Sequence, residues 1–393
     1  MMTTRLQPAS RMAVLPPSFF KTLQLNLNRL QSAGADVIRM DMGSPDLPPA
    51  PHIIRALEQS AEQPDHHGYL PFSGTPAYRA AWAEFYGRRF GVELDANTEI
   101  NGLLGSKEGI FKLPLAFVNP GEVVLIPDPG YATYSAGARF AGAEVVYMPL
   151  TAERHYLPDF DALSPDVLRR ARLLWLNYPN NPTGAVATLE FFAEAVALAR
   201  RHGFLLAHDA PYTEITYDGY TAPSLLQIPG AKDVAVEFHS LSKTANMAGW
   251  RAGVLCGNAD VIRTAASLQS NMDSGGFRPV SDAAVVALTG DQSWQVARNE
   301  IYRERRDLVV AGLRAAGLTA AVPAAAIYVW ARLPAGVDDD AYCNELLEST
   351  AITTTPGSLF GPSGRGYLRV ALSTPTDRVR EAMARWQTWA ERR

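Results

Sequence analysis

Cysteine is scarce in this sequence, and its scarcity bounds the kind of protein that it encodes. Among 393 residues only Cys256 and Cys343 occur, far apart and with apolar or mixed neighbours. A disulfide-stabilised scaffold is therefore excluded, and a reducing, cytoplasmic setting is favoured. The seven histidines show no spacing typical of metal ligands, so no metal centre is expected.

Long apolar runs and strong charge are also missing. No apolar stretch approaches the ~20 residues that a membrane-spanning helix needs. Pro16 and Pro17 lie where a secretory signal peptide would need an unbroken apolar segment. The net charge is −4, and no basic run is dense enough to indicate nucleic-acid binding. We therefore expect small molecules as partners, rather than a membrane or a nucleic acid.

The hydrophobic content and its pattern predict an α/β fold. Hydrophobic residues make up 47% of the sequence, which is enough to bury a substantial core, and the length suggests two or three domains. From about Pro49 to Arg278, short apolar runs alternate with helical patterns. These runs are continuous rather than alternating, which is typical of strands covered on both faces. This region is therefore predicted to form a mostly parallel central sheet with helices on both faces.

A different pattern follows Ser293. A long helical pattern extends to about Ala316, and a terminal helix is expected over 377–393, with short strands between them at 327–330 and 367–371. This order of elements predicts a smaller α+β domain. We expect an N-terminal arm (1–48) that packs with the small domain, a large domain (49–285) and a small C-terminal domain (286–393).

The most informative segment is Ser-Leu-Ser-Lys-Thr at 240–244, with Arg251 eight positions after Lys243. It follows an apolar run, 234–238, that predicts a strand. A lysine at the end of a strand, beside hydroxyls and a guanidinium, suits a Schiff-base enzyme that uses pyridoxal phosphate. The amine would react with the cofactor aldehyde, while the hydroxyls and the guanidinium would bind its phosphate. The alternative is a solvated loop with an ordinary lysine.

A second predicted strand, 205–209, ends in Asp209, 34 positions before Lys243. A carboxylate here would keep the pyridine nitrogen of the cofactor protonated, as an electron sink requires. Two parallel strands joined by a helical crossover would bring Asp209 and Lys243 to the same carboxyl edge of the sheet. The phenol of Tyr212 could hydrogen-bond the ring hydroxyl. Alternatively, the aspartate is a turn or cap residue and the tyrosine belongs to the core.

A glycine turn at Gly105, Ser106 and Lys107 opens a predicted helix. Backbone N–H groups at a helix N-terminus bind anions, so these residues are candidates to hold the phosphate. The turn lacks the Gly-Lys-Ser/Thr ending of a Walker loop. We therefore do not expect this turn to bind a nucleoside triphosphate.

Aromatic and amide side chains follow further predicted strands. Tyr131 comes after the apolar run 123–126 and could stack on the cofactor. Asn181 lies in the segment Asn-Tyr-Pro-Asn-Asn-Pro-Thr-Gly at 177–184, which follows the apolar run 173–176. An Asn-Pro pair at a strand exit suits a tight turn and is compatible with a cis peptide. The turn would present the Asn181 amide to the ring hydroxyl.

Together these motifs resemble the aminotransferase class I/II family, whose members are fold type I pyridoxal-phosphate enzymes. Tyr-Pro-Asn-Asn-Pro-Thr-Gly (178–184) and Ser-Leu-Ser-Lys-x6-Trp-Arg (240–251) are highly specific as a pair. Pro-Gly-Tyr (129–131) and Gly-Tyr-Leu-Arg-Val (366–370) fit the same family, and the resemblance covers nearly the whole chain in order.

The resemblance implies a role for each matching residue. Lys243 would bind the cofactor covalently and act as general acid and base, with Asp209 on the pyridine nitrogen. Arg369 would bind the substrate α-carboxylate, assisted by Asn181 and the backbone near Gly43. The remaining implied roles are stacking by Tyr131, ring-hydroxyl contacts from Asn181 and Tyr212, and phosphate binding by Gly105, Ser106, Lys107, Ser240, Ser242 and Arg251. Tyr69 would reach the phosphate of a neighbouring subunit, which implies a homodimer with shared active sites.

The fold and the cofactor do not settle the reaction class, because β-eliminating lyases, racemases and aminocyclopropane-carboxylate-type synthases use the same constellation. The motif set favours ping-pong transamination between an L-amino acid and a 2-oxo acid. Segments 105–110 and 271–275 are most similar to the diaminopimelate and alanine branch, and glutamate-like substrates also stay open. Arg278 or Lys107 could meet a second carboxylate, or be a surface charge. A non-catalytic regulatory module on this fold is the other alternative.

Overall fold

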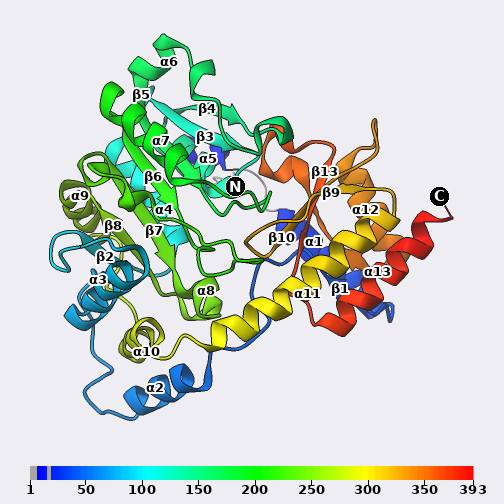
Figure 1. The fold of residues 1–393 in the computed structure, drawn as a ribbon, viewed down its shortest axis with the longest axis horizontal. Coiled ribbons are helices and arrows are strands. Elements are labelled where there is room, and N and C mark those ends of the chain that lie inside the picture. Colours follow the sequence, from blue (N-terminus) through cyan, green and yellow to red (C-terminus); the bar gives the residue numbers. More distant parts are fainter. Residues whose placement is uncertain (1–6, 16–18, 393) are drawn as a thin grey trace, which may run out of the picture.

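The computed structural model describes residues 7–15 and 19–392, which form a larger and a smaller body (Figure 1). The larger body is built on a seven-stranded sheet with the order β2-β8-β7-β6-β5-β3-β4. Its strands run in one direction except β8, which is antiparallel to β2 and β7. The strands are β2 (Ile100–Leu103), β3 (Val123–Asp128), β4 (Glu144–Pro149), β5 (Ala171–Asn177), β6 (Leu205–Asp209), β7 (Ala235–Ser240) and β8 (Gly253–Gly257).

Helices cover both faces of this sheet, as the continuous apolar runs predict. Alternate residues of β5 enter different cores: Leu174 and Leu176 pack on one face, while Leu173 and Trp175 pack on the other. The first face is covered by α2 (Pro51–Ala61), α3 (Pro76–Phe90), α6 (Pro165–Arg170), α7 (Leu189–His202) and α10 (Arg278–Thr289), and α8 (Leu241–Thr244) contributes Leu241. The second face is covered by α4 (Ser106–Phe117), α5 (Ala132–Phe140) and α9 (Ala259–Gln269).

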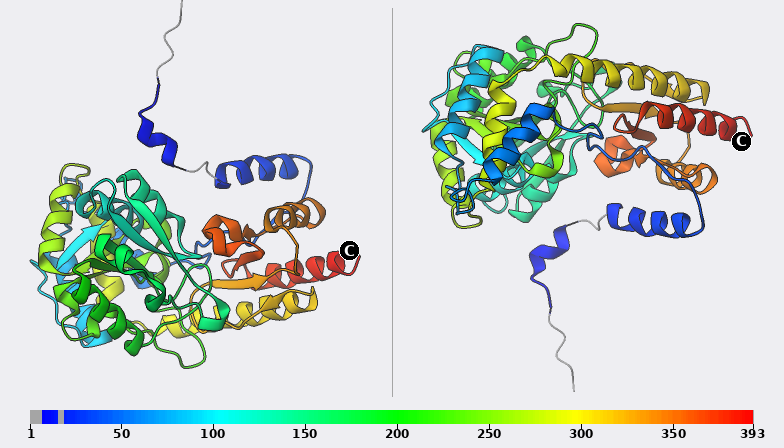
Figure 2. Two further views of the ribbon diagram at one scale, coloured as in Figure 1. Left: turned by 90° about the horizontal axis from the view of Figure 1, so that it is seen from above. Right: turned by 90° about the horizontal axis from the view of Figure 1, so that it is seen from below.

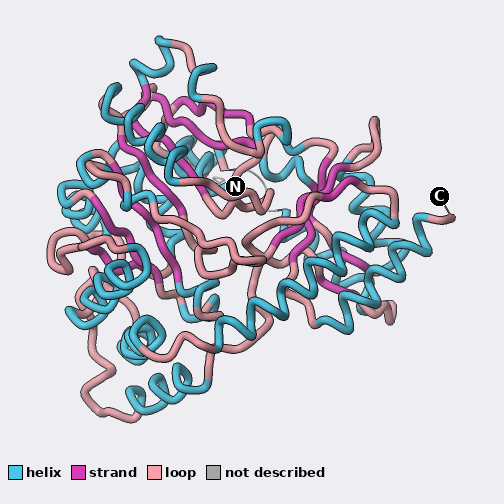
Figure 3. Tube along the Cα trace, viewed as in Figure 1, coloured by secondary structure: helices cyan, strands magenta, loops and turns pink. Residues whose placement is uncertain are grey.

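The smaller body contains a four-stranded antiparallel sheet with the order β12-β13-β10-β9 (Figure 3). Its strands are β9 (Thr319–Ala320), β10 (Tyr328–Arg332), β12 (Thr355–Pro356) and β13 (Tyr367–Ala371). The helices that accompany it are α11 (Trp294–Ala315), α12 (Asp339–Thr350) and α13 (Thr376–Ala390). The expected long helix after Ser293, both expected strands and the terminal helix are therefore confirmed, although the terminal helix ends at Ala390.

The described part of the N-terminal arm packs on the smaller body. In α1 (Phe19–Ser32), Leu23, Leu27 and Leu30 lie on one helix face and contact Leu347 of α12. Figure 2 shows α1 beside α12 in both views. The next segment, β1 (Ile38–Arg39), pairs in parallel with β11 (Ile352–Thr353). The domain division 1–48, 49–285 and 286–393 stays a prediction, and residues 1–6, 16–18 and 393 lie outside the described residues.

Short 3-10 helices complete the fold, and a pair of them replaces an expected α-helix. The chain crosses from β6 to β7 through loops with only η4 (Leu225–Gln227) and η5 (Ala231–Asp233), so the predicted helical crossover is wrong. Prolines at 211, 223 and 229 and glycines at 219 and 230 interrupt this segment and prevent a longer helix. The others are η1 (Ser10–Val14), η2 (Ala152–Arg154), η3 (Phe160–Ala162), η6 (Ala248–Trp250), η7 (Gly357–Phe360) and η8 (Pro362–Gly364). In the part of the chain that the structure covers, no helix combines the length and apolarity needed to cross a bilayer.

A buried carboxylate connects the centre of the sheet to the surrounding elements. Glu237 of β7 is fully buried, and Nδ1 of His208 in β6 lies 2.8 Å from its Oε2. Its carboxylate also accepts hydrogen bonds from the Tyr86 hydroxyl at 2.8 Å, the Ser224 hydroxyl at 2.9 Å and the Leu225 N–H at 2.9 Å. Burial alone would raise the pKa of Glu237, but the hydrogen bonds from His208, Tyr86 and Ser224 outweigh it and lower the pKa.

We expect Glu237→Ala to destabilise the protein by about 3 kcal/mol or more, because several buried donors lose their acceptor. Urea unfolding followed by tryptophan fluorescence measures this change. Because folding lowers the pKa of Glu237, its stabilisation is present above about pH 4.5, the ordinary value, and is lost as the pH falls further. Glu84→Ala, whose side chain is 59% exposed, is the control and should change the unfolding free energy by less than about 0.5 kcal/mol. If Glu237→Ala and Glu84→Ala change the unfolding free energy equally, Glu237 is not the buried acceptor that stabilises the fold.

Candidate active site

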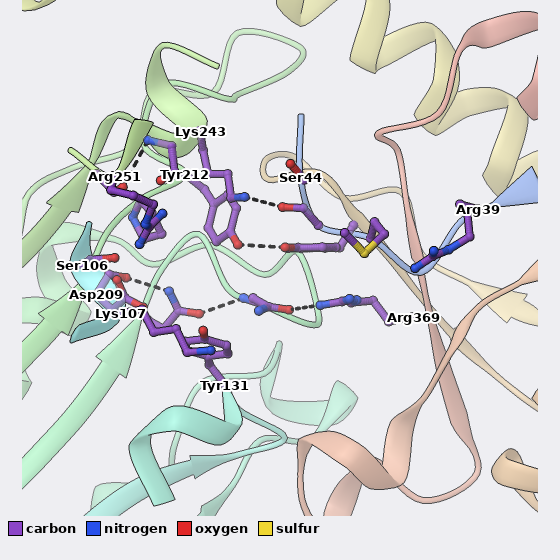
Figure 4. A pocket seen from close by; sticks show the side chains of 18 of the residues that line it. Arg39, Ser44, Ser106, Lys107, Tyr131, Asp209, Tyr212, Lys243, Arg251 and Arg369 are labelled. Atoms are coloured by element: carbon purple, nitrogen blue, oxygen red, sulfur yellow. Dashed lines mark hydrogen bonds between the residues drawn. The ribbon is translucent and has the colours of Figure 1, made fainter. Parts of the chain in front are cut away.

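A cavity of about 680 Å³ lies at the carboxyl ends of the central strands. Asn177, Asp209 and Ser240 are the last residues of β5, β6 and β7, and all of them line it. Open α/β sheets bind ligands at this edge. Asp209 and Lys243 face the same cavity, as the sequence predicts (Figure 4).

Lys243 reaches the cavity from the short helix α8. The Ser240 hydroxyl caps this helix by accepting a hydrogen bond from the Ser242 N–H at 3.1 Å, and the Lys243 ammonium donates to the carbonyl of Gly43. Burial lowers the pKa of Lys243 to about 8, and repulsion from Arg369 and Arg251 adds to the shift. A neutral amine is therefore accessible near physiological pH, as a nucleophile or a base requires.

Asp209 presents an unsatisfied carboxylate oxygen. Its Oδ2 accepts a hydrogen bond from the Tyr134 hydroxyl at 2.7 Å, whereas Oδ1 is buried and has no partner among the described residues. Burial raises the pKa of Asp209 to about 6, against the hydrogen bond from Tyr134, which lowers it. The carboxylate is therefore still ionised at neutral pH, and its free oxygen is suited to a cationic N–H donor.

Arg369 of β13 provides a buried guanidinium on the opposite side of the cavity. Its Nη1 donates to Oδ1 of Asn181 at 2.9 Å, and its Nη2 donates to the carbonyl of Asp41 at 2.7 Å. The guanidinium carbon lies 4.3 Å from the centre of the Tyr328 ring and 4.8 Å from that of Phe360. Its Nε is buried without a partner in the described chain. This group is suited to bind a carboxylate.

The glycine turn before α4 forms a tight cradle with Arg251. Gly105 has φ 79°, and a Cβ at this position would lie 2.1 Å from Nη2 of Arg251. Arg251 itself has φ 62°, and it donates to the carbonyls of Ala248 at 2.8 Å and Leu104 at 3.1 Å. Ser106 and Lys107 begin α4 and line the cavity, as do Ser240, Ser242 and Arg251, so an anion would meet N–H groups, hydroxyls and cations here.

Other predicted residues divide into those inside and outside the cavity. Tyr131 and Tyr212 line it, and the Tyr212 hydroxyl lies 2.9 Å from that of Tyr328. Tyr69 does not line it: its side chain is 94% exposed in the single chain, so it does not pack within its own subunit. Arg278 also lies outside, with its Nε 3.6 Å from Asp282, which leaves Lys107 as the named second-carboxylate candidate inside the cavity.

Several site residues were missed by the sequence analysis. The Asn177 side chain donates to the carbonyl of Asp209 at 2.7 Å and accepts from the Asn181 N–H at 2.8 Å, so it attaches the turn to β6. Its position at the strand end was a usable signal. Tyr134 and Tyr328 carried none, because their contacts bridge residues far apart in sequence. The Asn181–Pro182 peptide in this turn is cis.

Comparison with known proteins identifies the family. Residues 35–385 match the model of aminotransferase class I and II. The LL-diaminopimelate aminotransferase of Desulforudis audaxviator is 48% identical over 377 residues, covering 96% of each chain, and that of Moorella thermoacetica is 45% identical over 380 residues, covering 97% of each. Substrate-bound BacF from Bacillus subtilis superposes with a TM-score of 0.94 at 36% identity over 98% of each chain. This chain therefore belongs to the aminotransferase class I and II family, and it is a fold type I enzyme that transfers an amino group between an amino acid and a 2-oxo acid.

Proposed function

We propose that this aminotransferase binds pyridoxal 5′-phosphate through Lys243 and uses it to exchange amino groups by a ping-pong mechanism. The observation that carries the proposal is the pairing, in one cavity, of a lysine with a lowered pKa and a buried aspartate with an unpartnered oxygen. The first is suited to an aldehyde and the second to a pyridinium N–H.

The residues present fit this cofactor. Oδ1 of Asp209 lacks a donor that the ring nitrogen would supply, and the cradle of Gly105 and Arg251 suits a phosphate dianion. Tyr131 offers an aromatic face, while Asn181 and Tyr212 offer polar groups for a ring hydroxyl. Ser106, Lys107, Ser240 and Ser242 would complete the phosphate contacts.

The chain's own residues then divide the work of catalysis. When bound, the cofactor supplies an electron sink for the charge that develops at the substrate Cα. Arg369 holds the α-carboxylate, assisted by Asn181 and the backbone at Gly43, and thereby orients the Cα–H bond. Lys243 moves the proton at Cα with its neutral amine. Asp209 would hold a negative charge for the ring nitrogen of the cofactor, and burial of all these groups excludes water that would weaken their interactions.

The substrate and the setting are also part of the proposal. Relatives named LL-diaminopimelate aminotransferase support a diaminopimelate-like amino donor, with alanine-like and glutamate-like donors as the next candidates. We propose a cytoplasmic enzyme, for which the reduced cysteines are the support.

We further propose a homodimer whose active sites are shared. Tyr69 is 94% exposed, and Phe277, whose ring centre lies 6.0 Å from that of His67 in the same segment, is 49% exposed. Apolar side chains exposed together favour contact with a second chain. Tyr69 of one chain would reach the phosphate in the other.

Lys243 should carry the cofactor covalently. Borohydride reduction of the loaded enzyme is expected to label the peptide that contains Lys243, because this amine is buried at the site and burial lowers its pKa to about 8. Lys243→Ala should still bind pyridoxal phosphate but should not turn over. Peptide mass spectrometry and absorbance spectra measure both effects. Lys232→Ala, at a half-exposed surface lysine that pairs with Glu99, is the control. Label on any other lysine would refute the assignment.

Substitutions of Asp209 and Tyr134 should lower kcat by different amounts. Asp209→Asn removes the charge beside the ring nitrogen, so kcat should fall by about 100-fold or more while substrate binding persists. Tyr134→Phe removes only one hydrogen bond to the carboxylate and should lower kcat by about tenfold or less. Single-turnover kinetics and substrate titrations separate the two quantities. Similar kcat values for Asp209→Asn and the wild type would exclude Asp209 from this role.

The shared-site proposal predicts that two differently impaired chains restore activity when they form a heterodimer. Lys243→Ala and Tyr69→Phe chains should each be impaired, but a heterodimer would contain one doubly altered site and one intact site. Mixtures should therefore recover activity towards half that of the wild type after subunit exchange, which affinity tags on each chain can verify. If the mixture gives only the average of the two parents, Tyr69 acts within its own subunit.

A further inference from the structure

Arg39 brings a third guanidinium to the cavity, in addition to those of Arg251 and Arg369, and no established role uses it. It lies in β1 and lines the cavity on the same side as Arg369, with its side chain directed inward (Figure 4). Its Nε and Nη2 donate to the two carboxylate oxygens of Asp41, each at 2.7 Å. Asp41 is fully buried, whereas 33% of the Arg39 side chain is exposed. The pair is therefore fixed on one side and open on the other.

The part of the Arg39 guanidinium that Asp41 does not contact can still bind a carboxylate. A guanidinium has two edges that can each donate a parallel pair of N–H bonds to a carboxylate. Asp41 occupies the edge formed by Nε and Nη2. The other edge includes Nη1, which makes no hydrogen bond to the residues that the structure describes. Neutralising Asp41 needs only the first edge, so the second is available to a ligand.

Asp41 also sets the spacing between the two guanidinium groups. Its carboxylate holds Arg39, and its carbonyl accepts the hydrogen bond from Nη2 of Arg369 at 2.7 Å. The Thr353 hydroxyl donates to the same carboxylate, and the Thr355 hydroxyl lies 3.3 Å from the Asp41 carbonyl. Arg39 and Arg369 are thus connected through hydrogen bonds to the same residue, Asp41. Lys107, by contrast, lies on the far side of the cavity beside Ser106 (Figure 4).

We propose that Arg39 is a specificity-determining residue that binds the second carboxylate of a dicarboxylic amino acid or 2-oxo acid. The α-carboxylate lies on Arg369, and the far carboxylate lies on the free edge of Arg39 at a distance that Asp41 sets. This inference rests on the proposed function, because Arg369 must hold the α-carboxylate for the second contact to form. Substrates without the second carboxylate leave that edge unpaired.

The test compares L-glutamate with L-alanine as amino donors to the enzyme loaded with pyridoxal phosphate. In Arg39→Gln, the ratio of kcat/KM for glutamate to that for alanine should fall by about 10- to 100-fold, the effect of one charge-assisted bidentate contact. Arg39→Lys should fall between the wild type and Arg39→Gln, since it keeps the charge but not the paired N–H groups. Arg369→Gln should lower both values and keep their ratio within about threefold, as expected if both donors use that contact equally.

Two further variants control for misfolding and for the general loss of a positive charge. Arg39→Gln leaves Asp41 buried without a cation, so the double variant Arg39→Gln/Asp41→Asn, which removes both charges, should fold and show the same fall in the ratio. Arg263→Gln, at a remote arginine that is 75% exposed, should match the wild type. An unchanged ratio in the Arg39 variants overturns the inference and leaves the proposed function intact. A wild-type enzyme that, when loaded with pyridoxal phosphate, converts neither these two donors nor diaminopimelate to a 2-oxo acid overturns both.

Discussion

Parallel pairing of β5, β6 and β7 is the constraint on which the active site depends. In this register Asn177 lies opposite Asp209, and Asp209 lies opposite Phe238, so the carboxyl ends of the strands meet at the cavity. The Asn177 side chain then connects the carbonyl of Asp209 to the N–H of Asn181. A slip of one residue would turn Asp209 to the other face of the sheet, where His208 lies bonded to Glu237.

Burial at this edge of the sheet shifts the pKa values of acidic and basic groups in opposite directions. It lowers the pKa of the Lys243 amine to about 8 and raises that of the Asp209 carboxyl to about 6. Both shifts favour the neutral form, because a charge loses the stabilisation that water provides. The two pKa values therefore come to lie on either side of neutrality, the range in which a lysine can exchange protons while an aspartate keeps its charge.

The two bodies contribute different parts of the chemistry. Lys243 and Asp209 come from the larger body, whereas Arg369 comes from the smaller one and Arg39 from the arm packed beside it. The long helix α11 connects the bodies through Arg298, which donates to the carbonyls of Thr244 and Glu214, each at 2.6 Å. The position of Arg369 and Arg39 relative to Lys243 and Asp209 thus depends on contacts between the bodies.

Local sequence by itself determined the strands, the helix starts and the chemical types at the strand ends. Apolar runs must be buried, Thr188 and Gly203 cap α7 as their chemistry predicts, and the motifs around Asn181 and Lys243 are specific enough to identify the family. The expectation of a helix in the β6–β7 crossover was wrong, although the closely spaced prolines and glycines of that segment disfavour a helix.

Only the tertiary structure decided which distant groups meet. The hydrogen bond from Tyr134 to Asp209 spans 75 positions, and the one from Arg369 to Asp41 spans 328, so no local pattern could indicate either. The free edge of Arg39 is equally a product of folding, because the buried carboxylate of Asp41 holds the other edge of this guanidinium. The chemistry of a residue specifies which interactions it can make, whereas packing specifies the partner with which it makes them. Burial and hydrogen-bond geometry exist only in the folded chain.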